Sequence, residues 1–135
     1  MTAKGCGDID YSYFCTSGPE IESDPTGKNP HTPGAKMDSG KAPIFRGVLN
    51  YFPLAIAAVA EVSEVGAKKY AWKGWESVPD GFERYSDAMG RHILEEAFGD
   101  FDDGVNGTGC LHAAQVAWNA LARLELKLRR GDDDG

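Results

Sequence analysis

Apolar and small residues are concentrated in three stretches of the chain that favour helix, whereas the first 41 residues show neither a helical nor an alternating period. The first stretch predicts a helix over about 53–70, with proline at its first position and an Ala-rich interior. The others predict helices over about 81–98 and about 109–130. No segment alternates β-branched and polar residues cleanly, so we expect strands to be minor at most. The predicted fold class is all-α.

Local signals support the helix ends. Asp80 precedes the second helix and Glu83 follows three residues later, a pattern typical of a capping box. Basic residues near Arg130 complement the dipole at the end of the third helix. Three helices of this length bury little surface alone, so we expect helices of different subunits to associate.

The sequence predicts three regions. Residues 1–41 form an irregular segment that ends in a basic, glycine-rich loop, in which Lys36 and Lys41 are candidates to meet phosphate. Residues 42–130 form the helical domain, in which we expect the chemistry described below, and residues 131–135 form an acidic tail.

Composition narrows the possible partners. The chain has 135 residues and a net charge of -7, which fits one soluble domain and argues against binding a nucleic acid backbone. The longest apolar stretch, residues 52–60, is too short to span a membrane, and no secretory signal is visible. Three cysteines form neither an even disulfide set nor a paired metal motif, so we expect a cytoplasmic location.

Carboxylates form two candidate metal-binding groups. Glu61 and Glu64 are three positions apart and therefore share one face of the first helix. Glu96, Asp100 and Asp103 lie at the end of the second helix and in the loop after it. Such hard oxygen ligands suit Mg²⁺ or Mn²⁺. Both groups are equally typical of solvent-exposed acidic surfaces, and the residues alone leave that alternative open.

Other polar and aromatic residues have two readings. His92 and His112 fit hydrogen-bonded core histidines better than ligands. Asn119, on an otherwise apolar helix, requires a hydrogen-bond partner, which is either a neighbouring helix or a nucleobase. Trp75 is a packing residue or a stacking platform for a base. The glycine-rich loop does not have Walker spacing, and the acidic loop does not match an EF-hand.

Taken as a set, the motifs resemble one family of phage enzymes, the MazG-like dATP/dGTP diphosphohydrolases, over about residues 24–130. The resemblance rests on Gly34-Ala35-Lys36, Ala60-Glu61-Val62, Gly66-Ala67-Lys68-Lys69-Tyr70, Val78-Pro79-Asp80-Gly81, Arg91-His92 and Ala117-Trp118-Asn119-Ala120.

The resemblance implies an all-α pyrophosphohydrolase, a homodimer or homotetramer, that uses two or three Mg²⁺ or Mn²⁺ ions. It would convert a purine deoxynucleoside triphosphate, dGTP first and dATP second, to the monophosphate and pyrophosphate. In phages that carry 2-aminoadenine this supplies dGMP. Glu61 and Glu64 fit the first metal motif of the family. The second must be Asp100 and Asp103, with Asp100 where Glu is expected, which leaves Glu96 as a rival or additional ligand.

Positive side chains are the candidates for the outer phosphates, and they are Lys36, Lys41, Lys68, Lys69 and Arg91. Trp75 and Asn119 are the candidates for the purine. The contrasting hypothesis is a noncatalytic helical module that binds a nucleotide or a protein.

Overall fold

A computed structural model describes residues 21–133, and the chain divides into two compact units between Gly47 and Val48. The predicted all-α class is confirmed. Within residues 21–133, extended pairing is limited to one antiparallel bridge between Phe101 and Leu111. The first 20 residues of the predicted irregular segment, and the last two of the predicted acidic tail, lie outside the described residues.

The described part of the first unit is a series of turns around Asp24. The Asp24 carboxylate accepts hydrogen bonds from the backbone N–H groups of Thr26 (2.6 Å) and Lys36 (2.7 Å), and from the Thr26 hydroxyl. The Thr26 hydroxyl and the Lys36 N–H hold the pKa of Asp24 at about 2. The glycine-rich loop is therefore closed by one carboxylate that stays ionised.

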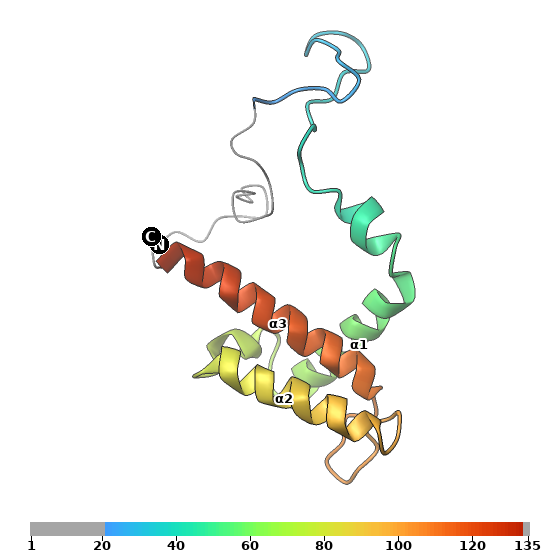
Figure 1. Cartoon of the computed structure of the whole chain (residues 1–135), viewed down its shortest axis with the longest axis vertical. Coiled ribbons are helices and arrows are strands. Elements are labelled where there is room, and N and C mark those ends of the chain that lie inside the picture. The colour runs from blue at the N-terminus through green and yellow to red at the C-terminus, as the bar shows by residue number, and fades with distance from the viewer. Residues whose placement is uncertain (1–20, 134–135) are drawn as a thin grey trace. The chain divides into compact units, whose positions relative to one another are not determined.

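Three helices make up the second unit, and all three lie where the sequence predicts them (Figure 1). They are α1 (Pro53–Lys69), α2 (Gly81–Glu96) and α3 (His112–Asp133). Two short turns were not predicted, a π-helix η2 (Phe45–Leu49) and a 3-10 helix η3 (Gly74–Ser77). No helix in the described chain is long and apolar enough to cross a membrane.

The capping prediction for α2 is wrong in its chemistry. Asp80 is the N-cap residue, but its φ of 54° is left-handed and its side chain makes no capping hydrogen bond. A side-chain cap requires extended backbone at this position, which aims the side-chain oxygen at the first free N–H groups.

The central helix of the second unit is α3, which packs against both α1 and α2 (Figure 1). On the α1 side, the Trp118 indole donates a hydrogen bond of 2.9 Å to the Ser63 hydroxyl. On the α2 side, Arg123 Nε donates to the Ser86 hydroxyl at 2.6 Å. The helices α2 and α3 run antiparallel, so the end of α2 meets the beginning of α3.

An unusually polar stripe lies on the buried face of α3. His112, Gln115, Asn119 and Ala122 repeat at helical spacing and are each at most 5% exposed. Buried polar side chains are tolerated only when they are hydrogen-bonded, so each polar member of this stripe requires a partner. The partners of His112 and Gln115 define the site described next.

Candidate functional site

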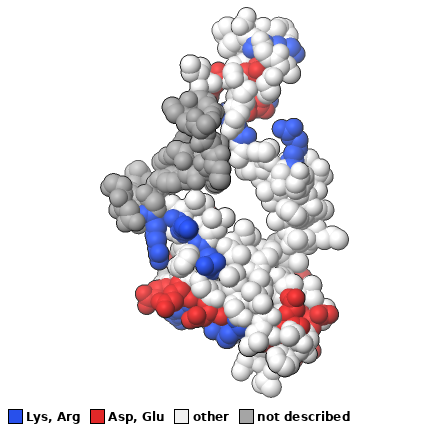
Figure 2. Space-filling model, viewed as in Figure 1, with Lys and Arg blue, Asp and Glu red and all other residues white. Residues whose placement is uncertain are grey.

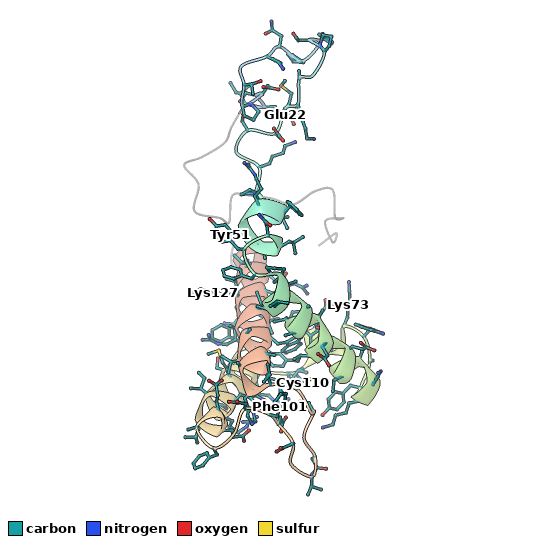
Figure 3. The ribbon with its side chains drawn as sticks, turned by 90° about the vertical axis from the view of Figure 1, so that its right-hand side faces the viewer. Glu22, Tyr51, Lys73, Phe101, Cys110 and Lys127 are labelled. Carbon is teal, nitrogen blue, oxygen red and sulfur yellow. The ribbon has the colours of Figure 1, made fainter. Side chains whose placement is uncertain are left out.

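The loop between α2 and α3 is folded around Asp102. One carboxylate oxygen of Asp102 accepts hydrogen bonds from the N–H and hydroxyl of Thr108, both at 3.2 Å, and from the Gln115 amide at 3.3 Å. The backbone of Asp102 also pairs with Cys110 and Gly109. Figure 3 shows Phe101, which precedes Asp102, close to Cys110 at the start of α3. Burial raises the pKa of Asp102, but the hydrogen bonds from Thr108 and Gln115 outweigh it and leave that pKa below its ordinary value.

This loop geometry fixes the beginning of α3. The backbone N–H of His112 donates to the Asp100 carbonyl at 2.8 Å, directly after the Phe101–Leu111 bridge. His112 is thereby held as the first residue of α3, with its side chain 7% exposed.

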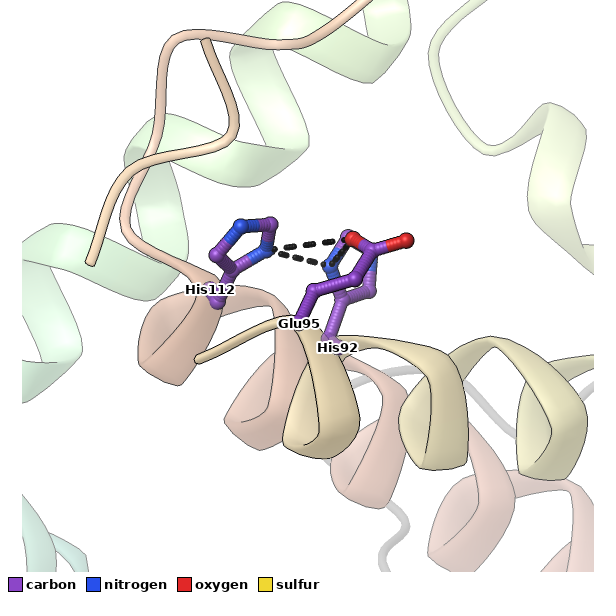
Figure 4. Close-up of side chains that lie close together, drawn as sticks. All are labelled: His92, Glu95 and His112. Carbon is purple, nitrogen blue, oxygen red and sulfur yellow. Dashed lines mark hydrogen bonds and ion pairs between the residues drawn. The ribbon is translucent and has the colours of Figure 1, made fainter. Parts of the chain in front are cut away.

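His112 meets two side chains from the last turns of α2 (Figure 4). The Nδ1 atoms of His92 and His112 are 2.9 Å apart, and a Glu95 oxygen lies 3.8 Å from the first and 3.5 Å from the second. His92 and Glu95 are three positions apart, so one helical face presents both.

Burial lowers the pKa of His92, and its neighbour His112 lowers it further, whereas Asp102 and Glu95 oppose the shift. Two adjacent imidazoles cannot both carry a positive charge cheaply. A neutral His92 ring leaves a nitrogen lone pair in the cluster, which either accepts an N–H or binds a cation.

A hollow of about 300 Å³ opens beside this cluster. Its polar lining comes from Glu95, Asp102, Asp103 and His112, and its apolar lining includes Phe98 and Phe101. Of the carboxylates predicted as ligands, Asp103 is thus the one that shares a hollow with the histidine cluster.

The remaining predicted carboxylates lie on exposed surface. Glu61 and Glu64 are exposed on α1 and flank Ser63, which holds α1 to α3. Glu64 forms an ion pair of 3.2 Å with Lys68. Glu96 is the last residue of α2 and is exposed, as is Asp100.

Among the described residues, one group of three His, Cys, Asp or Glu side chains has ligand atoms that all lie within 4.8 Å of one another: His92, Glu95 and His112. The structure therefore brings together two histidines that the sequence pattern indicated to be core residues. It does not bring the predicted carboxylates within the same distance of one another. A local signal was present, because His92 and Glu95 have the spacing of two ligands on one helical turn.

The candidate phosphate residues come from both units, and Figure 2 shows Lys and Arg side chains at more than one place on the visible face of the second unit. Lys36 and Lys41 belong to the first unit, where Lys41 lies 3.9 Å from Glu22. Arg91 is exposed on α2, and the Lys69 ammonium lies 5.3 Å from the Tyr70 ring centre.

Trp75 and Asn119 are engaged in the packing of the second unit. Trp75 packs edge to face with Tyr85 and Trp118, at centroid distances of 6.2 and 6.0 Å, and lies 5.4 Å from the Arg129 guanidinium. The Asn119 amide donates to the Gln115 carbonyl of its own helix at 2.7 Å, a partner that the sequence prediction did not include.

Comparison with known proteins identifies the family. The model of the N-terminal region of dATP/dGTP diphosphohydrolase matches residues 31–134. The chain belongs to this family. It is therefore a hydrolase that acts on the anhydride bonds of nucleoside triphosphates. A search of curated proteins and a search of solved structures each found no match.

Proposed function

We propose that the chain hydrolyses purine deoxynucleoside triphosphates between the α and β phosphates, with dGTP preferred and dATP second. The products are the deoxynucleoside monophosphate and pyrophosphate. The family match carries this proposal, since the family is defined by hydrolysis of these two nucleotides. The dGMP formed would supply synthesis of the 2-aminoadenine nucleotide in a phage, as the sequence resemblance implies.

The donor set on α1 fits Mg²⁺ or Mn²⁺. Glu61 and Glu64 are both exposed on the same helical face, and Glu64 forms an ion pair with the exposed Lys68. Such a weakly held carboxylate pair can be recruited by a hard cation. Glu96, Asp100 and Asp103 are the candidates to complete a site for two or three ions. When bound, the ions would neutralise phosphate charge and make water a better nucleophile.

The chain's own residues then have separate roles. A Glu61 or Glu64 carboxylate that is free of metal accepts a proton from the water that attacks the α phosphorus. Lys68, released from Glu64, neutralises an outer phosphate, as do Lys69 and Arg91. Trp75, which is partly exposed, remains the candidate to contact the purine, whereas contact by Asn119 would require its buried amide to become accessible. Lys36 and Lys41 are further phosphate candidates.

A homodimer or homotetramer is part of the proposal. Large apolar side chains lie exposed on the second unit, including Leu54 (85% exposed), Leu121 (49%) and Leu124 (52%). Apolar side chains of this exposure favour association with a second copy. Light scattering of the purified chain measures the stoichiometry.

The test is turnover of each nucleotide with Mg²⁺ or Mn²⁺ in ¹⁸O-labelled water. Attack at the α phosphorus places the label in the monophosphate, whereas attack at the β phosphorus places it in pyrophosphate. Release of orthophosphate contradicts cleavage between the α and β phosphates. No turnover with any nucleotide contradicts the proposal as a whole and favours a noncatalytic binding module.

Substitution of one carboxylate tests whether Glu61 takes part in the hydrolysis. Glu61→Gln keeps the size of an exposed side chain but removes its charge, and we expect kcat to fall by at least about 100-fold. Glu83→Gln on the first turn of α2 is the matched control, since Glu83 is also exposed. Equal activity of the two variants would remove Glu61 from the mechanism.

A further inference from the structure

The cluster of His92, Glu95 and His112 differs in chemistry from the carboxylates assigned to Mg²⁺ or Mn²⁺. Three donor atoms, two imidazole nitrogens and one carboxylate oxygen, lie within 4.8 Å of one another, two of them from α2 and one from α3 (Figure 4). The two nitrogens at 2.9 Å would satisfy each other by sharing one N–H. That hydrogen bond does not account for Glu95, whose oxygen lies beyond hydrogen-bond distance from both nitrogens.

The distances fit a single metal ion. Zinc–nitrogen and zinc–oxygen bonds of about 2.0–2.2 Å place neighbouring ligand atoms of a tetrahedral ion roughly 3.3–3.5 Å apart. The observed separations of 2.9, 3.5 and 3.8 Å bracket that range. Each atom needs to move by no more than about half an ångström. Glu95 has room to do so, because its side chain is 49% exposed.

The backbone holds the ligands in place before any ion binds. His92 and Glu95 lie on one turn of α2, and His112 is the first residue of α3, tied to the Asp100 carbonyl. The His112 side chain is only 7% exposed, so its ring has little freedom to rotate away from the other two ligands. Preorganised ligands of this kind bind a metal without a large ordering cost.

We propose that His92, Glu95 and His112 form a binding site for a divalent transition metal of the zinc class, distinct from the carboxylate site for Mg²⁺ or Mn²⁺. Imidazole nitrogens favour Zn²⁺ and Co²⁺, whereas Mg²⁺ prefers a set of oxygens. Three protein ligands leave a fourth position for water, and the hollow lined by Glu95 and His112 gives that position access to solvent. The bound ion links the end of α2 to the start of α3.

Cobalt is the probe, because tetrahedral Co²⁺ has strong visible absorption that requires neither nucleotide nor turnover. The full chain is stripped with a chelator and titrated with Co²⁺ and then with Zn²⁺, in the presence of excess Mg²⁺. We expect one Co²⁺ ion per chain, the spectrum of a four-coordinate ion, and displacement by Zn²⁺. Absence of such a spectrum, or its loss in excess Mg²⁺, overturns the proposal.

Variants identify the ligands. We expect Glu95→Gln to weaken Co²⁺ binding by at least 10-fold and His92→Ala by more. Glu83→Gln, a change to an exposed carboxylate elsewhere on α2, should bind Co²⁺ as the parent chain does. Circular dichroism checks that each variant keeps its helices. Glu95→Gln changes an exposed side chain, so it tests the site even if the more buried His92→Ala variant fails to fold. Unchanged Co²⁺ affinity in both Glu95→Gln and His92→Ala overturns the assignment. The outcome is independent of the proposed hydrolysis, which is measured separately with Glu61→Gln.

Discussion

A methyl group added at Gly107 tests whether the loop between α2 and α3 positions the site. A Cβ at Gly107 would overlap the carbonyl oxygen of Asp102, and it would lie 2.8 Å from both the carbonyl carbon and one carboxylate oxygen of the same residue. That carbonyl accepts the N–H of Gly109 at 2.8 Å, so it is fixed within the loop. Rotation of a side chain cannot relieve a contact with backbone, and Gly107→Ala therefore has to move the loop.

The cost follows from the hydrogen bonds that the movement breaks. Displacing Asp102 weakens its bonds to Gly109, Thr108 and Gln115, of which two or three would be lost. At about 1 kcal/mol for each bond the loss is about 2–3 kcal/mol. Replacing Gly by Ala returns about 0.4–1 kcal/mol by restricting the unfolded chain. The expected net loss is about 2 kcal/mol, which lowers the melting temperature of a unit of this size by roughly 10 °C.

The matched control is Gly104→Ala in the same loop, where an added Cβ meets nothing within 4 Å. Urea unfolding followed by tryptophan fluorescence gives the free energy of unfolding of each variant. We expect Gly104→Ala to lie within about 0.5 kcal/mol of the parent chain and Gly107→Ala to be destabilised and to bind Co²⁺ less tightly. Equal stability and equal Co²⁺ affinity of the two variants would refute the role given to Asp102.

Two further predictions concern the aromatic packing of the second unit. Trp118→Phe keeps a ring in place but loses the hydrogen bond to Ser63, so a double-mutant cycle with Ser63→Ala should give a coupling energy of about 1 kcal/mol in urea unfolding; a coupling near zero would contradict the α1–α3 link. Burial raises the pKa of Tyr85, whose hydroxyl donates to the Trp75 carbonyl at 2.8 Å. The stability that the neutral Tyr85 hydroxyl contributes is therefore complete below the ordinary pKa of 10.0 and is lost as the pH rises past that value. Alkaline unfolding of the parent chain should show this loss, and Tyr85→Phe should reduce it.

The helices could be predicted because their signals are local. Pro53 at the first position of α1 and the Ala-rich residues that follow specify that helix within the segment itself. The prediction that the Asp80 side chain caps α2 was wrong because capping depends on the backbone conformation of that residue. The backbone at Asp80 has a left-handed φ, which the amino-acid sequence does not reveal. The short turns η2 and η3 also carry no periodic signal long enough to detect.

The histidine cluster could not be predicted because it depends on how two helices meet. His92 and His112 are joined by the antiparallel packing of α2 on α3 and by a loop that Asp102 closes. A buried histidine is usually a hydrogen-bonded core residue, and sequence alone gave His112 no partner. The spacing of His92 and Glu95 was visible, but two ligands on one turn indicate a metal only when a third side chain from elsewhere in the fold joins them.

The proposed histidine site and the proposed carboxylate site are linked through α3. His112 begins α3, and Trp118 of the same helix holds α1 beside Glu61 and Glu64 through Ser63. The six residue steps from His112 to Trp118 span about 9 Å of regular helix, so a displacement of His112 also displaces Trp118. An ion that fixes His112 against α2 therefore fixes the base of the helix on which α1 rests. The proposed zinc-class site would do no chemistry itself but would affect how firmly α1 presents Glu61 and Glu64. Removing its ion should therefore lower both stability and turnover, whereas removing Mg²⁺ or Mn²⁺ should abolish turnover with a smaller effect on stability.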